Sequence, residues 1–223
     1  MIITSVRNHL QSLMTGRVWS LHWNSQNLLF AIMNFENLAP APSGRLLVKR
    51  RGSSITRRIP KPVVVIDTRE QVPFEFTGLN NWVGGTTRRK LDVGDYSVVG
   101  MERLLRLERK SLTDLITTLM QWRKRFFKEC EALAQFRHSA LLVEATYEEV
   151  KSFYGSELCT EAHPNAVSGS LDAVEARFGI PVIYTSQHRL LAEEKAASRL
   201  SKHFTYWYLE EAGMGRVLQP GDL

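Results

Sequence analysis

The chain has 223 residues, of which 43% are hydrophobic and 23% are charged. This length corresponds to one domain with an extension, and the balance is that of a soluble globular protein, which excludes disorder throughout. The longest apolar run, at 28–35, is far shorter than the ~20 residues that cross a bilayer, so we expect no membrane contact. Two cysteines, Cys130 and Cys159, make neither a disulfide framework nor a zinc site. They suit a reducing compartment, the cytoplasm, with the nucleoid as the place of action in a prokaryote or phage.

Positive charge is concentrated near the start of the chain. The whole sequence has 29 basic and 23 acidic residues, a net charge of +6. Residues 1–62 hold nine basic side chains and one acid, Glu36, for +8, so residues 63–223, with 20 basic and 22 acidic, carry −2. The high isoelectric point is therefore no evidence for a basic nucleic-acid surface on the remainder.

Residues 1–62 are predicted to be a basic, flexible extension with one short helix near 25–35. Proline at 40, 42, 60 and 62 and the basic cluster from Lys49 to Arg58 both oppose a packed core. Three interpretations stay open: an arm that grips phosphates, a transit-like peptide, and a translated leader ahead of the true start.

The remaining sequence alternates strands with helices. Strands are expected at 63–67, 88–100, 103–110, 139–146 and 181–186, the second and third forming a hairpin around 100–102. Helices are expected from Ser111 to Ala134 with a break near 121–124, at 147–154, from Pro164 to Gly179, and over 188–212. The pattern predicts one α/β domain over 63–212, a central mixed sheet flanked by helices, and a short tail at 213–223.

Acidic residues gather where the predicted strands end. Asp67 ends the first strand, Asp95 follows Gly94, and Glu108 and Lys110 share one face of the third strand. A glycine inside a strand marks a bulge or a close backbone approach, which would turn Asp95 toward Glu108. Carboxylates this close repel one another without a cation, and Mg²⁺ with oxygen ligands fits best. With a lysine to orient water or offset charge, the set predicts phosphodiester hydrolysis.

Each residue also has a structural interpretation. Acid-x-lysine is common on a solvated strand face, and Asp92 and Asp95 suit a turn. Ser111 with Asp114 three residues later is a helix cap, which would account for Asp114 entirely. The combination favours a functional site.

Two basic groups flank these acids and are predicted to bind DNA phosphates on either side of the scissile bond. They are Arg88, Arg89 and Lys90, and Arg123, Lys124, Arg125 and Lys128. The alternative is two solvated basic turns. No base-reading motif is present, so we expect little sequence specificity.

Three blocks follow one another in the sequence: VVVIDTRE at 63–70, LDVGDY at 91–96 and ERKSLTDL at 108–115. Together they resemble the nuclease domain of the XPF-type, Hef-like structure-selective endonucleases, whose Gly-Asp … Glu-Arg-Lys-x-x-x-Asp signature is complete here. The resemblance covers about 63–210. It implies a restriction-endonuclease-like core and Mg²⁺- or Mn²⁺-dependent cleavage of branched or flapped DNA in repair or recombination.

The resemblance also implies roles by position. Asp67, Glu70, Asp95 and Glu108 would surround the metal, and Lys110 would orient water or stabilise charge. Arg109 and Asp114 would support the site, and Arg69 would hold it or the DNA backbone. Asp67, Asp95, Glu108, Arg109 and Lys110 together form the predicted catalytic set.

The sequence departs from the family after the nuclease domain. Family members continue into tandem helix-hairpin-helix motifs, whereas eleven residues follow Ala212 here, so a separate junction-recognition partner is expected. The family also pairs through its later helices, which predicts a homodimer. The aromatic cluster Phe204, Tyr206, Trp207 and Tyr208 is typical of either core or interface.

Two other functions stay open. One is a catalytically inactive DNA-binding partner of the same fold. The other is a restriction or mobile-element nuclease acting on linear DNA. No acid of the signature is missing, which favours activity.

Overall fold

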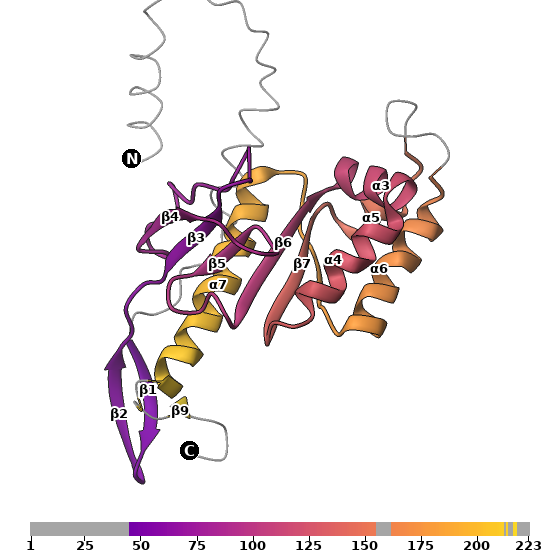
Figure 1. The fold of residues 1–223 in the computed structure, drawn as a ribbon. Helices are drawn as coiled ribbons and strands as arrows, with labels where there is room; N and C mark the ends of the chain where they lie inside the picture. Colours follow the sequence, from indigo (N-terminus) through magenta and orange to yellow (C-terminus); the bar gives the residue numbers. More distant parts are fainter. Residues whose placement is uncertain (1–44, 155–161, 212, 214–215, 218–223) are drawn as a thin grey trace, which may run out of the picture. The chain divides into compact units, whose positions relative to one another are not determined.

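A computed structural model of the protein describes residues 45–154, 162–211, 213 and 216–217 (Figure 1). The larger sheet has the strand order β4-β3-β5-β6-β7-β8. These strands are β3 (Val63–Asp67), β4 (Gly85–Arg89), β5 (Tyr96–Val98), β6 (Leu105–Ser111), β7 (His138–Glu144) and β8 (Val182–Tyr184). Only β5 runs antiparallel to its neighbours, so the predicted mixed sheet is confirmed.

Helices cover both faces of this sheet. They are α3 (Leu112–Gln121), α4 (Arg123–Leu133), α5 (Tyr147–Lys151), α6 (Pro164–Phe178) and α7 (Arg189–Glu211). Because side chains alternate along a strand, Leu142 packs with α7 on one face while Leu141 and Val143 pack with α3, α4 and α6 on the other. The predicted α/β class, a central sheet flanked by helices, is confirmed. Among the described residues, no helix is long and apolar enough to cross a membrane.

The helix boundaries follow local signals in the sequence. Ser111 caps α3, since its Oγ accepts a hydrogen bond from the Asp114 N–H at 3.1 Å. The expected break falls at Trp122, whose φ of −128° separates α3 from α4. Gly179 ends α6 in the left-handed conformation, with φ of 66°.

The single strand predicted over 88–100 is wrong. The segment forms two short strands, β4 and β5, which lie on opposite sides of β3. Residues 90–95 cross the carboxyl end of β3 between them, and Gly94 makes this possible with a φ of +77°. A Cβ on Gly94 would lie 3.3 Å from the Cδ of Arg106, so the close approach expected at this glycine is present.

Residues 45–58 are not an unpacked part of the extension. They form the hairpin β1 (Arg45–Arg50) and β2 (Ser53–Arg58), and β9 (Arg216–Val217) adds to it in the order β2-β1-β9. Arg51 and Gly52 both have positive φ, which suits a two-residue hairpin turn. Val48 is fully buried with Ile59 and with Leu209 of α7.

The sequence interpretation gave weight to the charges and overlooked the period-two apolar positions of this hairpin. The predicted domain boundaries at 62 and 213 stay predictions. The helix expected near 25–35 lies outside the described residues.

Candidate functional site

One rim of the sheet collects the acids named from the sequence. The parallel strands β3, β6 and β7 all end here, and antiparallel β5 begins here. The Asp67 N–H donates to the Asp95 carbonyl at 2.8 Å, and the Asp95 N–H donates to the Leu107 carbonyl at 2.9 Å. The backbone therefore holds Asp67, Asp95 and Glu108 next to one another across three strands.

A cavity of about 610 Å³ opens at this rim. Its lining includes seven acidic and four basic side chains, a formal excess of three negative charges. The acids are Asp67, Glu70, Asp92, Asp95, Glu108, Asp114 and Glu129, and the bases are Arg69, Arg109, Lys110 and Arg125. An excess of carboxylates in a concave site attracts cations and repels an unaccompanied phosphate.

Asp67 is buried and fully engaged by N–H donors. Its Oδ1 accepts from the N–H and Nε of Arg69 at 2.7 and 2.8 Å, and its Oδ2 accepts from the Leu91 N–H at 2.6 Å. Burial opposes the charged form, but these hydrogen bonds outweigh it and lower the pKa of Asp67. The loop that crosses the end of β3 is thus fastened to Asp67, and this carboxylate stays ionised.

Asp95 and Glu108 are two neighbouring carboxyls whose charged forms the site disfavours. The Asp95 Oδ2 accepts from the Arg109 N–H at 2.7 Å, which brings this carboxyl to β6 beside Glu108. Burial, reinforced by the charge of Glu108, raises the pKa of Asp95 to about 8. Burial also raises the pKa of Glu108. Two half-buried carboxyls that resist ionisation in one cavity mark a position where added positive charge is favourable.

Lys110 lies beside this pair. Its Nζ is 3.0 Å from Oε1 of Glu108, which agrees with the expectation that both share one face of β6. Burial acts to lower the pKa of Lys110, but attraction to Glu108 outweighs it and leaves the pKa raised. The ammonium is therefore charged within the cavity.

Arg109 connects three segments. It forms ion pairs with Glu70 at 3.3 Å and with Glu144, and its guanidinium lies 4.5 Å from the ring centre of Phe74. These contacts tie β6 to the 70–74 loop and to the end of β7. In this geometry Arg109 positions the site and keeps Glu70 paired.

The arrangement differs from a preformed metal centre. Across the part of the chain that the structure describes, no three His, Cys, Asp or Glu side chains are grouped so as to hold a metal ion. Asp67 is held by Arg69, Glu70 by Arg109 and Glu108 by Lys110. The acids share one cavity, but each of these three faces its own cation.

The other predicted residues fall into two groups. Asp114 lines the cavity and accepts from the Ser111 hydroxyl at 2.8 Å, so it both holds the capping residue of α3 and borders the site. Arg125 also lines the cavity, paired with Glu129, and Arg88 reaches the site by donating to the Glu70 carbonyl at 3.2 Å.

The remaining basic residues lie outside the cavity lining. Arg89 pairs with Glu102, and Arg123 donates to Ser170 of α6 at 2.6 Å. Lys90, Lys124 and Lys128 are exposed.

Sequence analysis missed two acids of this region. Glu144 ends the buried strand β7 as Asp67 ends β3, and only 9% of its side chain is exposed. The same signal that singled out Asp67 would have found it, because parallel strands end at a common rim. Glu129 on α4 lines the cavity, and nothing in its sequence context distinguished it from a surface acid.

Comparison with known proteins gave three findings. The family model described as the ERCC4 domain matches residues 66–195. A Methanocaldococcus jannaschii protein named as an ATP-dependent RNA helicase, MJ1505, is 30% identical over 141 residues, which are 62% of this chain and 15% of that protein.

Two structures of XPF from Aeropyrum pernix, each 20% identical, are also similar. The one in complex with DNA has a TM-score of 0.47 over 64% of this chain and 66% of that chain. The other has a TM-score of 0.48 over 69% of each.

Proposed function

Because this chain belongs to the ERCC4 domain family, we propose that it is a metal-dependent DNA endonuclease that cuts branched, flapped or forked DNA. The family assignment agrees with the resemblance to XPF-type nuclease domains. The observation that carries the proposal is the cavity at the rim, where seven acids and a charged lysine meet. A polyanionic substrate enters such a cavity only with a cation, which makes the acid excess and the DNA substrate mutually consistent.

The donor set fits a hard divalent ion. Mg²⁺ or Mn²⁺ takes carboxylate oxygens, and two half-buried residues offer them, Asp95 just before β5 and Glu108 on β6. Glu70 and Asp67 would join them only if Arg109 and Arg69 released them, and Glu108 would have to bind the ion while it contacts Lys110. When bound, such an ion lowers the pKa of a coordinated water and stabilises negative charge on the phosphate.

The side chains of the cavity divide the remaining work. Lys110 places an ammonium beside Glu108, where it orients the attacking water or offsets charge on the phosphate. Arg125 and Arg88, at the edge of the cavity, hold DNA phosphates, and the exposed Lys90, Lys124 and Lys128 extend this contact. Arg109 and Asp114 keep their neighbours in place.

Branched DNA is the substrate we favour. A branch point bends and opens more easily than an intact duplex, so a site with few base contacts can prefer it. Because residues 63–223 carry a net charge of −2, they would bind DNA only through local basic patches. This is consistent with a separate junction-recognition partner. A homodimer through the C-terminal helices also stays a prediction. Of its aromatic cluster, Phe204, Trp207 and Tyr208 pack within the chain, and Tyr206 is 55% exposed.

A catalytically inactive DNA-binding partner is the second candidate. The specific observation that favours it is the lack, among the residues described, of a ready-made group of three metal ligands. The ion pairs at Asp67, Glu70 and Glu108 would then be the permanent state of the site.

Cleavage assays separate the two candidates. Labelled flap, fork, Holliday-junction, linear duplex and single-stranded DNA are incubated with Mg²⁺ and with EDTA. We expect cutting of forks and flaps by the wild type in Mg²⁺ only, and a loss of at least ~100-fold in Asp95→Asn, Glu108→Gln and Lys110→Gln. Asp92→Asn, an exposed acid of the same cavity, is the matched control. Binding without cutting supports the inactive partner, and preferred cutting of linear duplex supports a restriction-type enzyme.

A further inference from the structure

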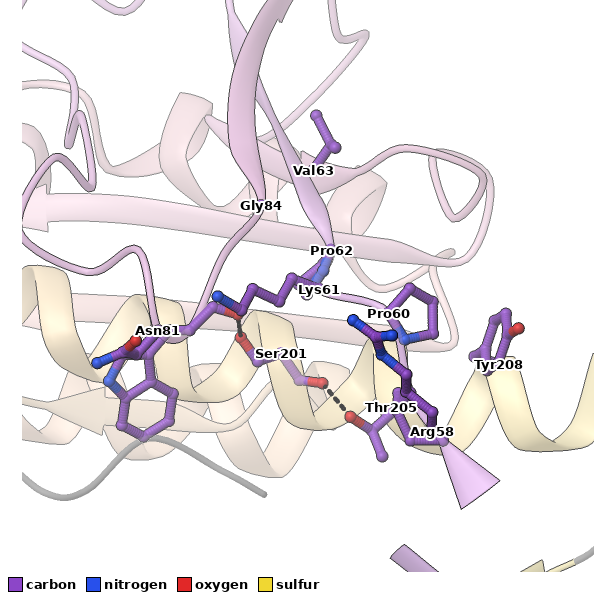
Figure 2. A pocket seen from close by; sticks show the side chains of 12 residues that line it. Arg58, Pro60, Lys61, Pro62, Val63, Asn81, Gly84, Ser201, Thr205 and Tyr208 are labelled. Carbon is purple, nitrogen blue, oxygen red and sulfur yellow. Dashed lines mark hydrogen bonds between the residues drawn. The ribbon is translucent and has the colours of Figure 1, made fainter. Parts of the chain in front are cut away.

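A second cavity, of about 720 Å³, lies at the other end of β3 from the acidic site. Figure 2 shows the segment 58–63 lying along α7, with Ser201, Thr205 and Tyr208 of the helix facing it. Val63, the first residue of β3, lines this cavity, and Asp67, the last, lines the acidic one. Four strand steps of about 3.3 Å separate the two, roughly 13 Å.

The charge of this cavity is opposite to that of the acidic site. Of the described residues that line it, none is a carboxylate, and two, Arg58 and Lys61, are exposed cations. Among the residues described, Arg58 forms no ion pair, and Lys61 donates to the Asn80 carbonyl at 2.6 Å. A basic cavity without a carboxylate favours an anionic group such as a phosphate.

The uncharged lining suits a planar, hydrogen-bonding group next to that phosphate. Tyr208 is half-buried and Asn81 is exposed, and neither side chain makes a hydrogen bond within the described part of the chain. Ser201 donates to the Trp82 carbonyl at 2.9 Å and Thr205 to the Ser201 carbonyl at 2.8 Å, so both hydroxyl oxygens can still accept. Aromatic rings beside cations are the usual surface for single-stranded nucleic acid.

We propose that this cavity binds one nucleotide of a single DNA strand that leaves the branch point held at the acidic site. The inference rests on the proposed function, because that function supplies the strand. In a duplex the bases are stacked and paired, so only an unpaired strand can place a base beside Tyr208 while Arg58 and Lys61 take its phosphates. These three residues lie outside residues 66–195, so the cavity is built mainly by segments that flank the matched domain.

The test measures binding without cutting. Full-length protein carrying Glu108→Gln binds two fluorescent DNAs over 50–200 mM salt: a fork with eight-nucleotide single-stranded arms and a blunt duplex of equal length. The variant pair is Arg58→Gln with Lys61→Gln. The matched control pair is Arg103→Gln with Arg137→Gln, which removes the same charge from exposed residues that line neither cavity. Melting temperatures verify that every protein is folded.

Loss of two single-strand phosphate contacts should make the negative slope of log K against log salt shallower by about 1.4, at ~0.7 for each contact. The ratio of parent to variant affinity for the fork should then fall about sevenfold between 50 and 200 mM salt. The control pair and the blunt duplex should show no such change. Asn81→Lys adds a phosphate contact and should make the slope for the fork steeper by about 0.7.

Three results would overturn the assignment. One is an equal slope in the cavity pair and the control pair, and another is no gain from Asn81→Lys. The third is displacement of the fork by dAMP at a concentration matching the fork's own affinity, which would make this a mononucleotide site. A slope change in a protein whose wild type cuts no DNA would reject the proposed nuclease activity and leave single-strand binding at this cavity standing. Metal-dependent cutting by the wild type, together with an unchanged slope in the cavity pair, would support the proposed function and reject this inference.

Discussion

Replacing Asp95 with asparagine should make the metal-free protein more stable while abolishing cutting. In the unfolded chain this carboxyl has its ordinary pKa of 3.8, and in the fold burial and Glu108 raise the pKa to about 8. Between these values the folded state holds a proton that the unfolded state has lost, so the wild type loses stability as pH rises from 4 to 8. The amide carries no such cost, and its oxygen can still accept from the Arg109 N–H.

The size of the gain follows from the shift. One pKa unit corresponds to about 1.36 kcal/mol, so a shift of roughly four units sets a ceiling near 5 kcal/mol. The buried amide adds N–H groups that need partners, which reduces the expected gain to roughly 1–3 kcal/mol. For a domain of this size that is about 3–10 °C in melting temperature.

The assay is thermal unfolding in EDTA at pH 5 and pH 8. The melting temperature of Asp95→Asn should exceed that of the wild type by more at pH 8 than at pH 5. Added Mg²⁺ should raise the melting temperature of the wild type but not of the variant. Asp92→Asn, exposed in the same cavity, should change stability by less than about 0.5 kcal/mol at both pH values. A variant less stable than the wild type at pH 8, or an advantage that does not depend on pH, would refute the reasoning.

Three further predictions test the parts of the fold that support the site. Gly94→Ala, at φ of +77°, should cost about 1–3 kcal/mol and reduce cutting, whereas Gly78→Ala, with open space around it, should be neutral in both unfolding and cleavage assays. Burial and the charge of neighbouring arginine lower the pKa of His203 to about 4, so up to about 3 kcal/mol of stability should be lost as pH falls from 6.5 to 4. His203→Gln should flatten that loss in urea unfolding. Val48→Asp places a charge at a fully buried position and should speed tryptic cleavage within 45–58; unchanged resistance would mean the hairpin does not depend on that packing.

Most of the scaffold of the site could be predicted because its signals are local. The buried run of β3 ends in Asp67, Ser111 caps α3, and Gly179 stops α6, and each depends on neighbours within a few residues. Alternation along β6 placed Glu108 and Lys110 on one face, and they are 3.0 Å apart.

What could not be predicted depends on contacts distant in sequence. The segment 88–100 reads as one strand, yet it splits because β4 and β5 pair with opposite sides of β3. Arg109 meets Glu144 across 35 residues, and no local pattern selects that partner. The β1–β2 hairpin was overlooked because its cation run outweighed its alternating apolar positions, whose burial against Leu209 requires the far end of the chain.

The ion pairs explain why the acids do not converge on one point in the chain as it stands. Several buried carboxylates at one rim repel each other, and each lowers its energy by facing the nearest cation. Asp67 forms an ion pair with Arg69, Glu70 with Arg109, and Glu108 with Lys110. Asp95 forms no ion pair with any of the described residues, and its charge is instead suppressed by a raised pKa. Of the four predicted metal ligands, Asp67, Glu70, Asp95 and Glu108, Asp95 is therefore the one where a divalent ion can displace a proton, and it is the position from which we expect metal binding to begin.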